Sequence, residues 1–204
     1  MSFIITASGD ELSLERPAPG HISAYTIAWA LSQLNRFTGH AVRPYSVAEH
    51  SLLVCDIAEQ ELGLDVHGQL AALMHDAHEA FVGDLHTPGK REVGEAWYAW
   101  ERKWEGVVQS AFGLRTVFHV HAEAIKRADL IALATEKRDL MRATPTAWLA
   151  LSGVEPLRRV NLYSQERQAM GWEDWRDRWL DKYHELDFAR NELLFPAKQE
   201  GGAA

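Results

Sequence analysis

Two histidines and two aspartates have residue types and surroundings that suit a metal ion. His75 and Asp76 are adjacent within the apolar stretch LAALMHDAHEAFVGD, where an unpaired charge would cost several kcal/mol. His50 and Asp129 stand in two other stretches, and Asp129 lies at the edge of an apolar run. Two imidazoles and two carboxylates form a mixed nitrogen and oxygen set, which suits Mn, Fe, Co, Ni or Zn better than calcium. Each residue alone is more often an ordinary hydrogen-bonded side chain, but the four together predict a site for one divalent transition metal.

The elements that must position these residues are predicted to be helices. Ser46 and Glu49 have the form of a capping box, so we expect a helix to begin at Ser46 and to carry His50 just after its first turn. Asp65 is a candidate N-cap for the next helix, which would hold the adjacent histidine and aspartate near its middle. Apolar residues at helical spacing predict helices over five ranges: 24–34, 46–62, 65–83, 93–112 and 119–141.

The chain as a whole is predicted to be all-α. It has no alternating pattern of useful strand length and no internal repeat, and only the leader to about residue 20 has an irregular or partly stranded character. We expect a single domain over 1–204, with a core at about 22–142 and a C-terminal helical extension at 143–204. Proline and glycine make 143–165 the candidate linker.

Composition narrows the class of protein. An apolar share of 47% is enough for a core, and a net charge of −8 argues against a protein that coats nucleic acid or an anionic membrane. The single cysteine, Cys55, excludes intramolecular disulfides and Cys-rich zinc modules. The N-terminus lacks the pattern of a signal peptide, and no window approaches the ~20 apolar residues of a membrane helix. We therefore expect a cytoplasmic protein that acts on a small molecule.

The order of the four candidate ligands resembles the H…HD…D signature of the HD-domain superfamily of metal-dependent phosphohydrolases. More narrowly, the chain is similar to the small bacterial 5'-deoxynucleotidases and the phage dATP triphosphohydrolases. The likeness covers about 22–141 and rests on several motifs in order: Asn35-Arg36-Phe37, the run 45–51 (YSVAEHS), the run 75–80 (HDAHEA), Gly83-Asp84, Thr87-Pro88 with Lys90, and the run 126–129 (KRAD). It implies an HD-type helical bundle with the metal between the central helices.

The resemblance also implies roles for individual residues. The metal ligands would be the four residues named above. Glu79 would activate or position the attacking water, and Asp84 would lie near the sugar 3'-hydroxyl. Arg36 and Lys90 would contact phosphate.

Three further residues leave questions open. Phe37 stands where the cellular 5'-nucleotidases have tryptophan, so the selection of sugar and base is not fixed. His78 stands where a small residue is common, and it is either an additional phosphate or proton-transfer group or a side chain that bonds a nearby carboxylate. Arg43, beside Pro44, is equally open as a second phosphate contact.

We expect the chain to hydrolyse the 5'-phosphate ester of deoxynucleotides, from dNMP to deoxynucleoside and phosphate or from dNTP to deoxynucleoside and triphosphate. No glycine-rich phosphate loop is present, which argues against kinase-type transfer. One alternative is an HD-fold nucleotide-binding regulatory module without turnover. Another is a di-iron HD oxygenase, for which His78 is the obvious additional ligand. The resemblance and the supply of tryptophans also predict a homo-oligomer.

Two other patterns have ordinary structural readings. Tryptophans recur at helical spacing in two places, which favours packing or a subunit contact over base stacking: Trp97, Trp100 and Trp104, then Trp172, Trp175 and Trp179. His119 and His121 are two residues apart, which is poor helical geometry for one ion, so we expect them at the surface.

Overall fold

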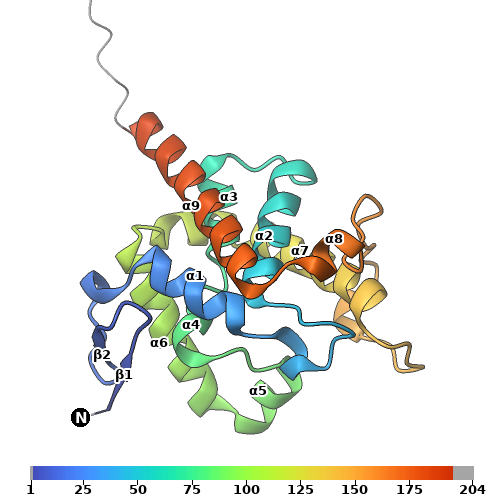
Figure 1. Ribbon diagram of the computed structural model, residues 1–204, viewed down its shortest axis with the longest axis horizontal. Coiled ribbons are helices and arrows are strands. Elements are labelled where there is room, and N and C mark those ends of the chain that lie inside the picture. Colours follow the sequence, from blue (N-terminus) through green and yellow to red (C-terminus); the bar gives the residue numbers. More distant parts are fainter. Residues whose placement is uncertain (1, 195–204) are drawn as a thin grey trace, which may run out of the picture.

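A computed structural model describes residues 2–194 of the 204-residue chain, and the tail-like residues 199–204 lie outside this part. Helices form most of it, so the all-α prediction is confirmed (Figure 1). The longer helices are α1 (Ala24–Gln33), α2 (Val47–Gln60), α3 (Val66–Leu73), α6 (Glu95–Ala111), α7 (Arg115–Leu140) and α9 (Trp172–Leu194). The shorter ones are α4 (Glu79–Val82), α5 (Thr87–Val93) and α8 (Gln165–Ala169). The leader forms a small antiparallel hairpin of β1 (Phe3–Ile5) and β2 (Glu11–Ser13).

The start of α2 follows the local sequence, but only half of the predicted capping box forms. The Ser46 hydroxyl accepts a hydrogen bond from the Glu49 amide at 3.1 Å, as expected for an N-cap. The Glu49 carboxylate does not serve the cap: it accepts hydrogen bonds from Arg43 and Arg167. These two arginines therefore tie the surrounding segments to α2.

The prediction of one helix over 65–83 is wrong. Helix α3 ends at Leu73, turns follow, and α4 begins only at Glu79. The cause is local, because the His75 ring donates from Nδ1 to the Ala72 carbonyl oxygen at 2.8 Å and so uses the acceptor that a continuing helix would need. The adjacent histidine and aspartate thus lie in a turn between two helices.

Two helix starts also differ from the prediction. Helix α5 begins at Thr87, in a stretch for which the sequence analysis predicts no helix. Pro88 occupies its first turn, where a missing N–H costs nothing. Helix α7 begins at Arg115, four residues before the predicted 119. Neither difference affects a candidate metal ligand, because α5 carries none and Asp129 still lies in α7.

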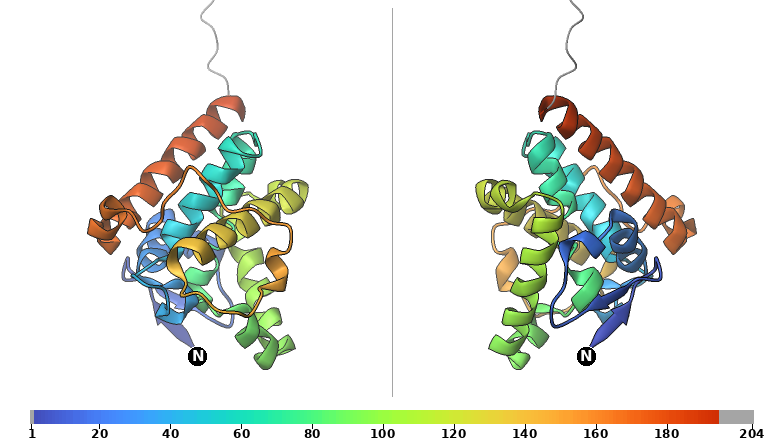
Figure 2. Two further views of the ribbon diagram at one scale, coloured as in Figure 1. Left: turned by 90° about the vertical axis from the view of Figure 1, so that its right-hand side faces the viewer. Right: turned by 90° about the vertical axis from the view of Figure 1, so that its left-hand side faces the viewer.

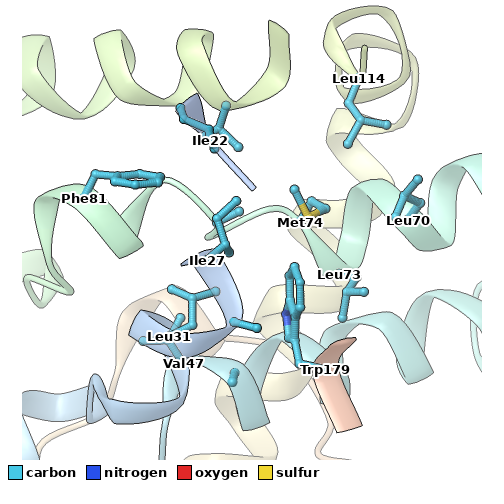
Figure 3. Packing of buried hydrophobic residues seen from close by; sticks show 14 of the residues in the cluster. Ile22, Ile27, Leu31, Val47, Leu70, Leu73, Met74, Phe81, Leu114 and Trp179 are labelled. Atoms are coloured by element: carbon cyan, nitrogen blue, oxygen red, sulfur yellow. The ribbon is translucent and has the colours of Figure 1, made fainter. Parts of the chain in front are cut away.

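The C-terminal helix is part of the core. Trp179 of α9 is fully buried and lies in one hydrophobic cluster with Ile27 and Leu31 of α1 and Leu73 of α3 (Figure 3). The packing interpretation of the tryptophan stripes is confirmed for three of their members, which are buried: Trp104, Trp175 and Trp179.

The segment between α7 and α8 runs back along α7 (Figure 2). The Leu157 amide donates to Thr135 Oγ1 at 2.9 Å, and Arg138 of α7 donates to the Val160 carbonyl at 2.6 Å. The predicted linker therefore has its own contacts with the core. Among the described residues, no helix is long and apolar enough to cross a membrane.

Candidate metal centre

Two packed helices and the turn after a third supply the four predicted ligands. His50 lies on α2, Asp129 lies on α7, and His75 and Asp76 occupy the turn that follows α3. Helices α2, α3 and α7 contact one another, so residues far apart in the sequence meet here. The histidine on α2 is fully buried, whereas the two aspartates keep limited access to solvent.

The ligand atoms converge on one point. His50 Nε2 lies 3.2 Å from His75 Nε2, 3.4 Å from Asp76 Oδ2 and 3.5 Å from Asp129 Oδ1. Donor atoms bound about 2.0–2.2 Å from one ion at tetrahedral or octahedral angles are about 3–3.5 Å apart, so the separations fit a single cation. The first three ligands form the tight group, and Asp129 lies at its edge, with its Oδ2 accepting from Lys126 at 2.7 Å.

Hydrogen bonds from the far ring nitrogens orient both imidazoles. His75 Nδ1 donates to a backbone carbonyl, and His50 Nδ1 donates to Glu136 Oε1 at 2.6 Å. Each ring therefore directs its Nε2 atom toward the other ligands. A carboxylate behind a metal-binding histidine fixes its orientation and raises its basicity.

Glu136 is the residue of this centre that the sequence analysis missed. It is fully buried on α7, and besides the histidine it accepts from the Tyr45 hydroxyl at 2.9 Å and from Arg36 at 3.3 Å. Burial opposes its ionisation, but Arg36 and His50 outweigh burial, so the pKa of Glu136 lies below its ordinary value. Its spacing of seven residues from Asp129, on the same helix face, was the available signal.

The remaining charges are also balanced within the cluster. Burial and Arg36 act against protonation of His50, but Glu136 and Asp76 outweigh them and raise the pKa of His50 to about 9. A cation that binds this ring must displace that proton, so binding weakens as the pH falls. Burial also opposes ionisation of Asp76, yet the neighbouring His75 and His50 hold its pKa well below the usual value.

Arg36 lies directly behind these ligands. Its guanidinium is 3.5 Å from Asp76 and 3.3 Å from Glu136, and only 12% of its side chain is exposed. Burial opposes its charge, but the two carboxylates outweigh burial and raise the pKa of Arg36. The predicted phosphate contact is therefore beside the metal ligands and already braces them.

A cleft of about 540 Å³ opens onto the centre. It is lined by three of the metal ligands and by two predicted substrate contacts, with further residues of α6 and α7: His75, Asp76, Asp129, His78, Lys90, Glu101, Glu105, Gln109, Arg115, Phe118, His119, Ala122, Ile125 and Lys126. His119 is exposed, as predicted, and it lines this cleft. A larger groove, of about 900 Å³, lies between α7 and residues 153–159 and contains none of the predicted site residues.

Two carboxyl groups near the cleft are biased toward the protonated form. Burial raises the pKa of Glu79 well above its ordinary value, and the charges of Asp76 and Asp84 add to this effect. Burial likewise raises the pKa of Asp84, which Arg36 partly offsets. A carboxyl group of raised pKa holds its proton to a higher pH than a free carboxyl group does, which suits a group that exchanges protons.

Comparison with known proteins places the chain in a family. No family model matches it. It is 36% identical over 162 residues to the uncharacterized protein YfdR of Escherichia coli K12. The aligned region covers 79% of this chain and 85% of that protein. The chain belongs to the YfdR family. It is also 36% identical over 137 residues to the uncharacterized protein RCAP_rcc00048 of Rhodobacter capsulatus. This aligned region covers 65% of this chain and 70% of that protein.

This YfdR-family chain does not bring every predicted contact into the cleft. Arg43 donates to both oxygens of Glu49, at 2.8 and 2.7 Å, and to the Leu162 carbonyl, so its donors already serve a structural clamp. Phe37 lies in a turn with a positive φ of 56°, beside Arg36 and 6.2 Å from the ring of Trp148. Such strain in a non-glycine residue is typical of functional segments.

Proposed function

We propose that this chain is a metal-dependent phosphohydrolase of deoxynucleotides with an HD-type helical bundle. The observation that supports it most is the convergence of His50, His75, Asp76 and Asp129, in the order of the HD signature, with Glu136 orienting the first histidine. The reaction is hydrolysis of the bond between the 5'-oxygen and phosphorus.

The four ligands would hold one divalent transition metal. When bound, such an ion lowers the pKa of water and polarises a phosphoryl oxygen. Glu79, whose pKa burial raises, takes the proton of the attacking water at its carboxylate. The pKa values of Asp76 and Asp129 are lowered, so both carboxylates stay ionised. They therefore remain able to bind the cation while Glu79 exchanges its proton.

Two cations would bind the phosphate. Lys90 lines the cleft and donates to Glu101 at 2.5 Å, which leaves two further ammonium protons for a phosphate oxygen. Arg36 supplies positive charge from behind Asp76. Fixed cations stabilise the charge that spreads over the phosphoryl oxygens in the transition state. Asp84 would accept a hydrogen bond from the sugar hydroxyl.

The test is product analysis with two substrates side by side. The Mn- or Co-loaded protein is offered dAMP and dATP, with a chelator-treated sample as the control. Orthophosphate from dAMP identifies a 5'-deoxynucleotidase, and tripolyphosphate from dATP identifies a triphosphohydrolase. No product from either substrate, with metal bound, would contradict the proposal and favour a regulatory module.

A single substitution tests the role of Glu79. We expect Glu79→Gln to keep the ion at His50, His75, Asp76 and Asp129 and to lower turnover by at least about a hundredfold, because the amide cannot accept the proton. Glu105→Gln is the matched control, since Glu105 lines the same cleft but is not one of the predicted site residues. Full activity of the Glu79 variant would exclude the role assigned here.

A further inference from the structure

A second group of ligand-type side chains lies beside the first. His78 and Glu79 stand at the start of α4, and Glu101 comes from α6. One ligand atom from each of the three lies within 4.8 Å of the others. His78 and Glu101 line the cleft that also opens onto the first centre.

The burial of this group is not matched by hydrogen bonds. His78 is 5% exposed and Glu79 is 3% exposed. Within the described residues, neither His78 Nε2 nor Glu79 Oε2 has a hydrogen-bond partner, and His78 Nε2 is 3.6 Å from Glu101 Oε1, beyond hydrogen-bond distance. Buried polar atoms are almost always satisfied, so two unsatisfied atoms in one small space indicate a missing ligand.

We propose that His78, Glu79 and Glu101 bind a second divalent cation. One imidazole nitrogen and two carboxylate oxygens suit Mn, Fe, Co or Zn, and the cation would satisfy both unpartnered atoms at once. The inference goes beyond the proposed function, because metal binding is measured without any substrate.

Lys90 competes with this cation. Its ammonium now donates to Glu101 Oε1 at 2.5 Å, and its flexible side chain is 20% exposed, so it can swing out into the cleft. The ammonium satisfies only Glu101, and it leaves the other two ligands unpaired. A second cation therefore displaces Lys90, and removal of the ammonium strengthens binding.

The first experiment measures metal stoichiometry on the full chain. The protein is dialysed to equilibrium against Mn²⁺ alone, and bound manganese is measured by elemental analysis. We expect two ions per chain in the natural protein, one in Glu101→Gln, and two in the matched control Glu105→Gln, which changes the neighbouring turn of α6. One ion in the natural protein, or two ions in Glu101→Gln, would overturn the proposal.

The second experiment does not depend on the folding of the Glu101 variant. In Lys90→Gln the competing ammonium is absent, so we expect the weaker manganese step in a calorimetric titration to tighten by about tenfold. Asp129→Asn serves as the reciprocal variant, because it weakens the first step and leaves the second in place. Unchanged affinity of the second step in Lys90→Gln would contradict the proposal, whatever the outcome of the phosphohydrolase assays.

Discussion

Glu136 carries a negative charge in a place that solvent does not reach, and the three side chains around it compensate that charge. Tyr45 and His50 donate to one oxygen, and Arg36 approaches the other. This carboxylate links His50, a candidate metal ligand, to the arginine beside Asp76. At the scale of single residues, it is therefore the group that fixes the orientation of His50.

Glu136→Gln should weaken metal binding by roughly 10–100-fold, the range typical of partners behind a metal ligand. The amide keeps the shape but removes the charge that holds the proton of His50 Nδ1 in place. Competition between the protein and a chelator for Mn²⁺ measures the change. Glu123→Gln, an exposed position on the same helix, is the control. Equal affinities of the two variants would show that Glu136 has no part in metal binding.

Sequence and structure agree where the residue pattern reveals the deciding contact, and they differ where it does not. The start of α2 was predicted because the Ser46 hydroxyl accepts from the amide of Glu49, only three residues further along the chain. The end of α3 was not, because the His75 ring takes the Ala72 carbonyl, a choice that spacing does not reveal. Glu136 was missed because its bond to His50 joins residues 86 positions apart.

At the scale of helices, the clamp around Glu49 deserves a test. Glu49 is fully buried at the start of α2 and receives hydrogen bonds from Arg43 and Arg167, which lie before α2 and in α8. Arg43 also donates to the Leu162 carbonyl. One carboxylate thus connects α2 with two segments that are more than a hundred residues apart in the sequence.

Glu49→Gln should lower the free energy of unfolding by about 3–5 kcal/mol, because it leaves the largely buried guanidinium of Arg43 and the partly buried one of Arg167 without their counter-charge. Urea unfolding measured by circular dichroism gives this value. Glu59→Gln, on the same helix and partly exposed, should change it by no more than about 0.5 kcal/mol. A loss from Glu49→Gln as small as that of the control would mean that the arginines find other partners.

At the scale of the whole molecule, the first and last helices of the described chain, α1 and α9, contribute to the same hydrophobic cluster. The expected division into a core at 22–142 and an extension at 143–204 separates α9 from partners that it covers in the structure. Trp104, Trp175 and Trp179 are buried, whereas the other five tryptophans are partly exposed: Trp29, Trp97, Trp100, Trp148 and Trp172. The homo-oligomer therefore stays a prediction, based on the resemblance and on these tryptophans.

Trp179→Ala should therefore destabilise the entire fold, and not only the end of the chain. A fully buried tryptophan replaced by alanine costs about 3–5 kcal/mol. Leu193→Ala, on the same helix with a side chain that is 65% exposed, should cost little. The two variants are compared by thermal unfolding together with Mn²⁺ affinity. Helix α9 packs against α2, which carries His50, and against α3, which precedes His75 and Asp76. We therefore expect Trp179→Ala to lower both the thermal stability and the Mn²⁺ affinity. If Trp179→Ala unfolded α9 alone and left the Mn²⁺ affinity unchanged, α9 would instead be an independent extension.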